Sequence, residues 1–581
     1  MNWRSLMKRD SVRLAGIFLL TGLFFGNIFS NEFVLEDFDY IVNRPLIHSL
    51  VNLPRFFAGY IPPDGQPGIY APLKTLFCCL NYLRWELNPV GYHLVALTVH
   101  LWGVLMAWAI ARRFLQHRQL ALLSAVLFAV HPVHVESVTA MAASMDTLGA
   151  VFLLTAFYFY IRAVGHPSLL PGWGYAPGPD ALSYPSSGQE GGRGYYFLAL
   201  AFSCLSIFTY EFCLTLPLLF CFYDVFFAPT GKWRNKLARL VPFFLLAAFY
   251  LAAKISVLGG LAHGGYLLGN FGLTMLVVVK AVFKAVCLMF FPVFLSYNHV
   301  LAPGISSFGM SEFDRQSVLS QSLLDSYTGP AFLFLLLILS ATFRFRRRPL
   351  VIFAVGWFFL SLLPSFNIIP NGIYLQERSL YHGSVAWCML MAVMLYRLPG
   401  LMKTEFSRRV MKIGLVGMVL FFGGRVWWRN AQYRDVVTAM EAAVWGNPQS
   451  AALRLSLSQA YLQTGDLPRA QDSLQKAIAL NPYNTQAYFW GAILYQVTGD
   501  TVDAMQSLLQ AVAINPDFAE AYYNLAGIYY MMGQDEEGAV NFNKAINLLR
   551  QQGRVLEAGE YALRMDEALR SYRQQEQANP Q

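Results

Sequence analysis

The sequence predicts an all-α protein in which a polytopic membrane part is followed by a solenoid of short helices. Hydrophobic residues make up 56% of the 581 residues and charged residues only 13%, whereas soluble globular proteins carry about a quarter charged residues. Apolar runs long enough to cross a bilayer recur through the first part of the chain. From about residue 431 they give way to a repeat with a period of 34 residues.

The two parts also differ in charge. Residues 1–429 contain 33 Lys and Arg against 18 Asp and Glu, a net of +15, whereas residues 430–581 contain 10 against 16, a net of −6. The basic excess lies in loops between apolar runs, as membrane topology requires, and no pattern indicates a nucleic-acid partner. We therefore expect a membrane domain over 1–429 and a separate extracytoplasmic domain over 430–581.

Eleven apolar runs are predicted to cross the membrane; they begin near residues 12, 91, 119, 146, 195, 212, 240, 330, 350, 380 and 411. A twelfth run, Leu273–Leu295, carries Lys280 and Lys284 on one helical face, so it could lie in the interface instead. If it does not cross, the basic clusters all fall on one side; if it does, the cluster Arg344–Arg348 moves to the other side. The sequence thus favours eleven spans, a cytoplasmic N-terminus and an interfacial or outer segment over 259–328.

The same topology defines the loops and the cellular location. Residues 31–88 form the first outer loop, and the Gly-, Pro- and Ser-rich residues 165–194 form a cytoplasmic linker. The basic, apolar N-terminus could be a signal peptide, but the many further spans favour a retained first helix. We expect an integral protein of the bacterial inner membrane with periplasmic repeats, or of the endoplasmic reticulum with luminal repeats if the chain is eukaryotic.

Four sets of residues recur with the period of 34, and Asn-Pro ends each unit. The sets are Gly465, Gly499 and Gly533; Tyr461, Tyr495 and Tyr529; Ala477, Ala511 and Ala545; and Asn447, Asn481 and Asn515. This pattern is typical of tetratricopeptide repeats, each a pair of antiparallel helices. We expect repeats at about 450–482, 484–516 and 518–550 and a capping helix at 554–576. The concave face of such an array usually binds a protein or peptide.

Charged residues gather on the predicted outer side. Glu36, Asp37 and Asp39 follow the first span at once. The turn from His131 to Asp146 also falls on this side, as do Glu211 and the pair Glu377–Arg378; these positions did not enter the choice of topology. Acidic side chains beside a membrane are costly unless they serve a purpose. This distribution predicts one site built from several outer loops.

Several stretches in this order resemble a known family. They are FVLEDFDYIVNRPLI (33–47), YAPLKTLFCCLNYLRWELNPVGYHLVALTVHL (70–101), FAVHPVHVESVTAMAASMDTLG (128–149), YEFCLTLPLLFCFYDVFF (210–227) and WFFLSLLPSFNIIPNGIYLQERSLY (357–381). Together with the repeats, they resemble the transmembrane and tetratricopeptide-repeat O-mannosyltransferases, which belong to the C-type (GT-C) glycosyltransferases. The resemblance implies transfer of a sugar, mannose above all, from a polyprenyl-phosphate donor to an acceptor hydroxyl, with inversion. The acceptor would be Ser or Thr of a protein.

The resemblance assigns roles to the acidic pair and to one arginine. Glu36 and Asp37 match the family's acidic pair; we expect Asp37 to be the base that removes the hydroxyl proton, with Glu36 or Asp39 positioning the acceptor or binding an ion. The family motif survives as Glu377-Arg378-Ser379-Leu380-Tyr381, so Arg378 is the expected ligand of the donor phosphate. The alternative for Arg378 is a structural ion pair with Glu377 or another loop carboxylate.

The histidines of the third stretch match the family as well. Pro132 should end the preceding helix and turn His131, His134 and Glu136 towards the outer aqueous face. Two histidines three residues apart are weak evidence for a metal, so hydrogen bonding to a sugar or to backbone is preferred. No cofactor is required, although a divalent metal stays an alternative. Asp146 would help the acceptor side or cap its helix.

Three cationic positions of the family are neutral in this chain, namely Ala71, Ser144 and Tyr210, the last beside the retained Glu211. Lys74 and Lys254 could compensate, since lysine can serve a phosphate as a point charge. The losses leave two alternatives open: a catalytically inactive membrane scaffold that acts through its repeats, and an enzyme with a lipid or glycan acceptor. The expected partners are therefore a lipid-linked sugar, the bilayer, and a protein or peptide on the repeats.

Overall fold

The computed structural model describes residues 3–58, 70–165, 169–170, 192–228, 232–261, 265–302, 305–307, 309–310, 321–401 and 404–578. The predicted linker 165–194 lies almost entirely outside these residues. By its contacts the chain forms two compact units, one up to Ala442 and one from Ala443 onward. The division falls within one helix, α17 (Val436–Gly446). The boundary predicted between 429 and 430 lies near the end of the preceding helix and stays a prediction.

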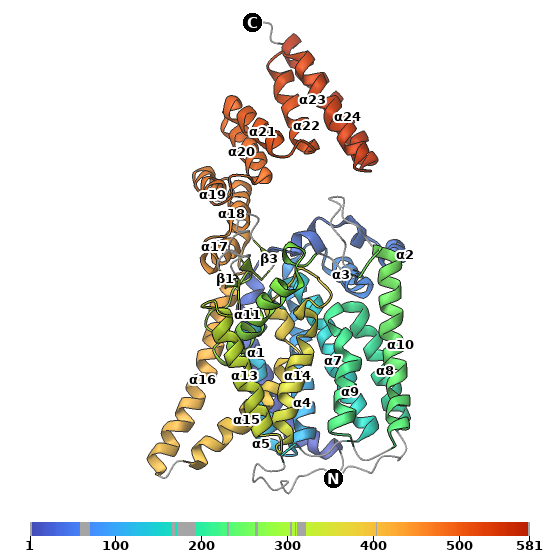
Figure 1. Ribbon diagram of the computed structural model, residues 1–581, viewed down its shortest axis with the longest axis vertical. Coiled ribbons are helices and arrows are strands. Elements are labelled where there is room, and N and C mark those ends of the chain that lie inside the picture. Colours follow the sequence, from blue (N-terminus) through green and yellow to red (C-terminus); the bar gives the residue numbers. More distant parts are fainter. Residues whose placement is uncertain are drawn as a thin grey trace. The chain divides into compact units, whose positions relative to one another are not determined.

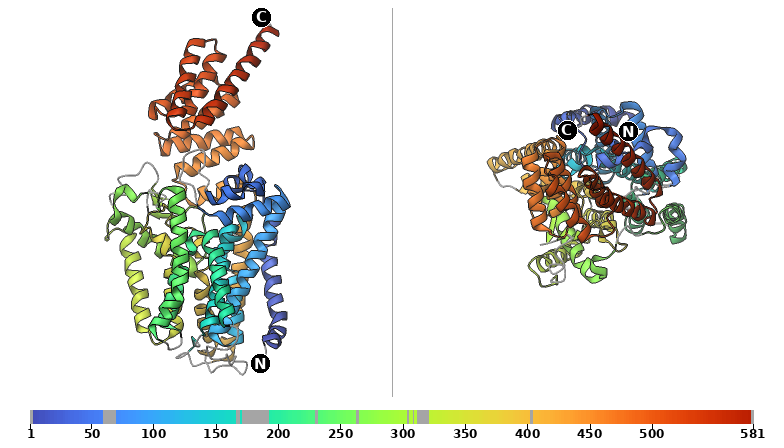
Figure 2. Two further views of the ribbon diagram at one scale, coloured as in Figure 1. Left: turned by 90° about the vertical axis from the view of Figure 1, so that its right-hand side faces the viewer. Right: turned by 90° about the horizontal axis from the view of Figure 1, so that it is seen from above.

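The first unit is a helical bundle with short helices in its loops (Figures 1 and 2). Among the described residues, its helices of more than five residues are α1 (Trp3–Phe25), α2 (Leu53–Ala58), α3 (Pro72–Trp85), α4 (Pro89–Leu115), α5 (Arg118–Ala129), α7 (Met141–Val164), α8 (Gly192–Thr209), α9 (Leu216–Phe226), α10 (Trp233–Leu258), α11 (Phe271–Phe290), α13 (Thr328–Arg344), α14 (Pro349–Ser361), α15 (Ser384–Leu401) and α16 (Glu405–Ala431). Each of the eleven predicted apolar runs forms a helix.

The centre of this bundle is α7, which packs against α4 and α8 and is buried along most of its length. Large aromatic side chains fill the surrounding core, among them Trp108, Phe157 and Trp357, each at most 2% exposed. The start of α1 lies at one end of the bundle, and α3 and β1 (Val300–Ala302) lie at the other (Figure 1). Because α7 is packed on several sides, it gives the loops at the end of the bundle near α3 and β1 a rigid helix to pack against.

Six helices are long and apolar enough to cross a membrane among the described residues. Five of them are α4, α7, α10, α11 and α16, and the sixth, Asp10–Ser30, combines most of α1 with the 3-10 turn that follows it. A seventh results if α5 and the segment Pro132–Thr139, bent by 50°, count as one span. The total of eleven spans stays a prediction, because several apolar helices are shorter than a bilayer requires, for example α14.

The run for which the sequence left two readings open is one continuous apolar helix, α11. Lys280 on this helix is buried and pairs with Asp325 across 3.2 Å between Nζ and Oδ2. The partner offsets part of the cost of burying the ammonium group. α11 passes the same length and hydropathy test as the other candidate spans, so its two lysines do not by themselves argue for an interfacial position.

The prediction of a purely helical protein missed a small sheet. β1, β2 (Ile305–Ser306) and β3 (Gly309–Met310) form three antiparallel strands in the order β1-β2-β3. Strands of two or three residues are too short for alternation of apolar and polar residues to reveal them. The sheet follows α11 and lies within the predicted interfacial or outer segment 259–328.

The second unit consists of paired helices. They are α18 (Ala451–Gln463) with α19 (Leu467–Leu480), α20 (Thr485–Thr498) with α21 (Thr501–Ile514), α22 (Ala519–Met531) with α23 (Asp535–Gln551), and the last helix α24 (Val555–Ala578). The periodic glycines Gly465, Gly499 and Gly533 have φ of +80°, +88° and +74°, a region that side chains disfavour. The periodic alanines are 0% exposed between helices. The period therefore reflects one turn and one close helix contact in each repeat.

Candidate active site

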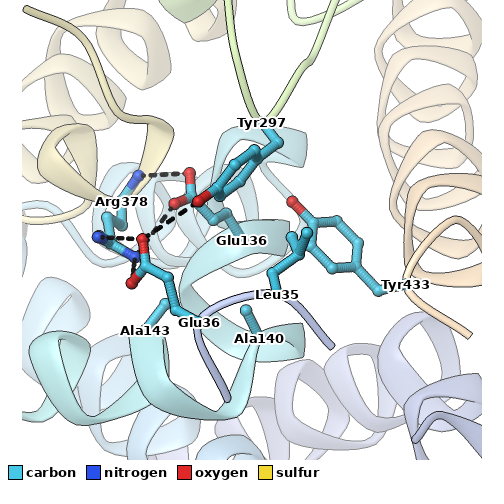
Figure 3. A pocket seen from close by; sticks show the side chains of 8 residues that line it. All are labelled: Leu35, Glu36, Glu136, Ala140, Ala143, Tyr297, Arg378 and Tyr433. Carbon is cyan, nitrogen blue, oxygen red and sulfur yellow. Dashed lines mark hydrogen bonds and ion pairs between the residues drawn. The ribbon is translucent and has the colours of Figure 1, made fainter. Parts of the chain in front are cut away.

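Loops from distant parts of the sequence meet at the end of the bundle where β1 and α3 lie. They surround a small pocket, drawn in Figure 3 and lined by Leu35, Glu36, Glu136, Ala140, Ala143, Tyr297, Arg378 and Tyr433. Leu35 and Glu36 follow α1, Glu136 lies on the short helix α6 (Val135–Thr139), and Arg378 lies on the 3-10 turn η9 (Glu377–Leu380). Three of the predicted site residues, Glu36, Glu136 and Arg378, thus line one pocket.

Arg378 is the centre of this arrangement. Its Nη1 and Nη2 donate to the two carboxylate oxygens of Glu36 at 2.8 and 3.0 Å. Nη1 also lies 3.5 Å from Glu136, and Nε lies 3.6 Å from Asp146. The backbone N–H of Arg378 donates to the second oxygen of Glu136 at 3.3 Å. A forked guanidinium suits such a ring of carboxylates, and it is the side chain best shaped to hold a phosphate.

A second cation completes the cluster. Lys74, buried on α3, donates to Asp146 at 2.9 Å, and its ammonium lies 4.2 Å from the centre of the Tyr40 ring. Burial alone would lower the pKa of Lys74, but Asp146 and the other surrounding groups outweigh it, so the net pKa is raised. Lys74 and Arg378 therefore both carry charge and share one carboxylate partner, Asp146.

Asp37 lies behind the pocket and anchors the first loop. One of its oxygens accepts from the N–H of Val34 at 3.0 Å and the other from the N–H of Ala142 at 2.7 Å. Ala142 lies in the first turn of α7, where N–H groups have no partner within the helix. Asp37 is only 1% exposed, and this burial raises its pKa to about 7 against the effect of the two N–H donors. The carboxyl group thus titrates near neutral pH.

Glu36 differs from its neighbour in exposure and in pKa. Its side chain is 23% exposed, and Tyr297 approaches one of its oxygens at 3.5 Å. Burial alone would raise the pKa of Glu36, but the charge and hydrogen bonds of Arg378 outweigh it and the net pKa is lowered. The acidic pair therefore contains one firmly ionised carboxylate held by an arginine and one weaker acid held by backbone.

The expectation that His131 and His134 face the outer aqueous side is wrong. Pro132 does end α5, but the chain folds both imidazoles into the core, at 2% and 0% exposure. His131 Nε2 donates to the carbonyl of Met289 at 3.2 Å, and its Nδ1 accepts from the N–H of Val133 at 3.3 Å. Backbone groups thus use both nitrogens of His131, which leaves none for a metal or a sugar.

His134 belongs to a buried network with Tyr381, which the sequence had placed among the site candidates. Ser384 Oγ donates to the carbonyl of Tyr381, so His134 Nε2 donates to Ser384 Oγ at 2.9 Å. The Tyr381 hydroxyl contacts Nδ1 of His100 at 2.9 Å and packs against Gly103. Tyr381 is 0% exposed, so it supports η9 from below and does not line the pocket.

Glu377, next to Arg378, points away from the pocket. Its Oε1 accepts from the N–H of Ser296 at 2.7 Å and contacts Nε2 of His299 at 3.0 Å. These contacts tie η9 to the segment that carries Tyr297. Glu377 is therefore not the ion-pair partner of Arg378, and the alternative of another loop carboxylate describes the observed geometry.

The remaining candidates lie outside the pocket lining. Asp39 is exposed on the first loop. Glu211 forms its own pair with Lys254, 2.5 Å apart. The cation of this pair comes from α10. Tyr210 itself packs against Gly149 of α7.

Sequence reasoning did not find three tyrosines and a histidine of this region: Tyr40, Tyr297, Tyr433 and His299. Tyr297 and Tyr433 lie far from the family motifs, and aromatic residues are too common in this chain to single them out. Among the residues that the structure describes, no group of three or more His, Cys, Asp or Glu side chains could hold a metal ion.

Comparisons with known proteins agree with both parts of the chain. The family model described as "Tetratricopeptide repeat" matches residues 451–484 and 519–552, and the one described as "TPR repeat" matches 498–533. These matches fall on the helix pairs of the second unit.

Curated relatives cover most of the chain at modest identity. Protein O-mannosyl-transferase TMTC3 of Homo sapiens is 23% identical over 81% of this chain and 51% of its own length. Protein O-mannosyl-transferase F38B6.6 of Caenorhabditis elegans is 22% identical over 78% of this chain and 60% of its own length. Protein O-mannosyl-transferase Tmtc1 of Drosophila melanogaster is 32% identical, over 27% of this chain and 19% of its own length. The chain thus spans about half the length of the relatives that it matches most extensively.

Among solved structures, ArnT from Cupriavidus metallidurans bound to undecaprenyl phosphate aligns with 88% of this chain and 80% of its own, with 13% identity and a TM-score of 0.38. MamA aligns with 30% of this chain and 96% of its own, with 19% identity and a TM-score of 0.20. TM-scores this low carry no argument about the fold, so the assignment of the chain rests on its sequence relatives. The chain is an integral membrane protein with tetratricopeptide repeats that resembles, along most of its length, the transmembrane and tetratricopeptide-repeat O-mannosyltransferases.

Proposed function

We propose that the protein is a membrane glycosyltransferase that moves a sugar, most simply mannose, from a polyprenyl-phosphate donor to an acceptor hydroxyl on the extracytoplasmic side. The observation that carries this proposal is the cluster of Glu36, Asp37, Glu136, Asp146, Lys74 and Arg378 at one end of the bundle. Transfer from a phosphate needs a base for the hydroxyl and cations for the departing phosphate, and this cluster holds both.

Asp37 is the proposed base. A base works best when its pKa lies near the working pH, and the pKa of Asp37 is about 7. Both of its oxygens accept one backbone hydrogen bond, and each keeps a second lone pair that can receive the proton. Because one base and one phosphate leaving group suffice for direct displacement, we propose inversion at the sugar carbon.

Arg378 and Lys74 are the proposed ligands of the donor phosphate, with Lys254 as a further cation from α10. The tetratricopeptide repeats would bind a protein or peptide acceptor or a partner, and the acceptor hydroxyl would belong to Ser or Thr. The expected membrane is the bacterial inner membrane, or the endoplasmic reticulum in a eukaryote.

The experiment is sugar transfer by the purified full-length chain in nanodiscs, with polyprenyl-phosphomannose as donor and a cell lysate as acceptor. We expect labelled product from the unaltered protein and a loss of about a hundredfold or more in the Asp37→Asn variant, because the amide cannot accept the proton. The amide keeps one oxygen for the N–H of Ala142 but places its NH2 against the N–H of Val34, so stability should decrease and turnover is compared per folded molecule. Equal turnover by a well-folded Asp37→Asn variant would contradict the assignment of the base.

A second candidate function follows from the neutral residues at 71, 144 and 210. Ala71 and Ser144 are buried, and the Ser144 hydroxyl donates to the carbonyl of Met141 at 2.6 Å, so neither offers a charge to a phosphate. A membrane scaffold that acts through its repeats would tolerate these losses. Absence of transfer from every lipid-linked sugar tested would favour the scaffold, whereas labelled lipid or glycan in place of protein would change the acceptor alone.

A further inference from the structure

The guanidinium of Arg378 has no nitrogen free for a phosphate in this structure. Nη1 and Nη2 hold Glu36, Nη1 also faces Glu136, and Nε faces Gln376 at 3.2 Å and Asp146 at 3.6 Å. Nη1 and Nη2 both face Glu36, so a phosphate that binds these two nitrogens together must replace a carboxylate. The question is which of the three carboxylates yields.

Glu136 and Asp146 are firmly held. The Glu136 side chain is 4% exposed, lies on a short helix and also accepts the backbone N–H of Arg378. The Asp146 side chain is 7% exposed, lies on the buried helix α7 and accepts from Lys74 at 2.9 Å. Removal of Arg378 from either would leave a buried carboxylate with poorer compensation, which is costly.

Glu36 is the carboxylate that can leave. It is the most exposed of the three, at 23%, and among the described residues its one other hydrogen-bond partner is Tyr297 at 3.5 Å. Its two contacts with Arg378 occupy the same two nitrogens that a phosphate would use. Because Glu36 is more exposed than Glu136 or Asp146, water can solvate its released carboxylate, which lowers the cost of breaking this pair.

The backbone allows this release without a loop movement. Asp37 pins the loop through the N–H groups of Val34 and Ala142. Leu35, between these anchors and beside Glu36, has φ of +54°, a conformation that a non-glycine residue keeps only when its surroundings hold it. Because the backbone is fixed, rotation about the side-chain bonds of Glu36 is enough to uncover Arg378.

We propose that Glu36 is a latch, which occupies the phosphate position of Arg378 while the donor is absent and is released towards the acceptor side when a lipid-linked phosphate binds. The released carboxylate then accepts a hydrogen bond from a backbone N–H of the acceptor, while Asp37 takes the proton of the acceptor hydroxyl. Binding is consequently ordered, donor before acceptor, since the acceptor group is not available until the phosphate has displaced it. This inference rests on the proposed function and adds the order of binding.

The probe is farnesyl phosphate, a short polyprenyl phosphate, bound to the full-length protein in nanodiscs. Glu36→Gln removes the charge that competes for Arg378, so we expect it to tighten farnesyl phosphate binding about fivefold or more, the scale of one partly exposed ion pair. Glu36→Ala, which places no amide against Arg378, should act in the same direction. Glu32→Gln is the matched control, because Glu32 is an exposed carboxylate of the same loop. In transfer assays Glu36→Gln should lower both the donor KM and kcat.

The outcomes separate the latch from the proposed function. If the unaltered protein binds farnesyl phosphate, Arg378→Gln abolishes binding, and both Glu36 variants bind no more tightly than Glu32→Gln, the donor site stands and the latch is overturned. If the unaltered protein does not bind, or if farnesol displaces the probe as well as farnesyl phosphate does, the phosphate site fails, and the latch falls with it.

Discussion

The pocket around Arg378 and the buried imidazole cluster, which consists of His131, His134 and the adjoining Tyr381, come from the same two stretches of sequence but have different roles. The stretch from His131 to Glu136 sends its histidines into the core and its carboxylate into the pocket. The stretch from Glu377 to Tyr381 sends Arg378 into the pocket and Tyr381 into the core. In the core, His131 and His134 make hydrogen bonds to backbone and to Ser384, whereas in the pocket Glu36 and Glu136 face the cation Arg378. A sequence motif therefore identifies a region of the molecule. The structure is needed to show which of its side chains line the pocket and which are buried in the core.

The largest expected effect tests the pocket at Arg378. Arg378→Gln should reduce transfer by about a hundredfold to a thousandfold, the usual cost of removing one preorganised group that stabilises developing charge. Arg378→Lys should fall between this variant and the unaltered protein, because lysine keeps the charge but loses the forked geometry. The measurement is kcat/KM for the donor.

The control for Arg378 is Arg434→Gln, since the Arg434 side chain is 71% exposed and lies outside the pocket lining. A similar loss of transfer in both arginine variants would mean that net charge, and not the pocket, carries the effect.

The next effect is the pH dependence of transfer. A base with a pKa of about 7 must be ionised to act, so transfer should fall about tenfold per pH unit below that value and level off above it. The histidines of the core should leave no mark on this profile, because they stay neutral hydrogen-bonding groups. A profile that is flat from pH 5 to 8 would contradict a base with a pKa of about 7.

The Asp37 carboxyl group also makes stability depend on pH, and stability should fall over the range in which transfer rises. Between the ordinary carboxyl pKa of about 4 and a pKa of about 7, the folded chain keeps a proton that the unfolded chain has released. The free energy of unfolding should therefore decrease as pH rises through this window. The Asp37→Asn variant should lack this part of the slope in thermal unfolding at a series of pH values.

The smallest effect on transfer belongs to the imidazole cluster. His134→Phe removes the hydrogen bond to Ser384 and should reduce the free energy of unfolding by about 1–3 kcal/mol. Transfer per folded molecule should stay close to that of the unaltered protein, because His134 is 0% exposed. Thermal unfolding and active-site-normalised turnover measure the two quantities. A folded His134→Phe variant with a changed pH profile would place this imidazole in the reaction after all.

Much of the architecture was predictable from the sequence because it depends on local patterns. The period of 34 identified the helix pairs of the repeats, since each repeat places the same glycine in the same left-handed turn. The apolar runs identified the helices of the bundle. The number of spans did not follow, because apolar helices as short as α14 look the same in sequence whether or not they cross a bilayer.

The site was predictable in its members but not in its contacts. Glu36, Glu136 and Arg378 could be named because charged residues are rare in an apolar chain. A charged side chain next to a membrane span is costly unless it has a partner or a function. Their pairing could not be named, because Glu36 and Arg378 are 342 positions apart and no period relates them. The burial of His131 and His134 was missed for a related reason, since Pro132 fixes where α5 ends but not where the following side chains turn.

The sequence separation within the Glu36–Arg378 pair also bears on how the protein is made. Chains are synthesised from the N-terminus, and their parts fold in that order. The loop that carries Glu36 emerges early, and Ala142, which completes the Asp37 anchor, follows 105 positions later. Arg378 arrives only after α14, when most of the bundle has already been inserted. A nascent chain therefore carries Glu36 and Glu136 before Arg378 is made, and it gains a complete site only at a late stage of membrane insertion.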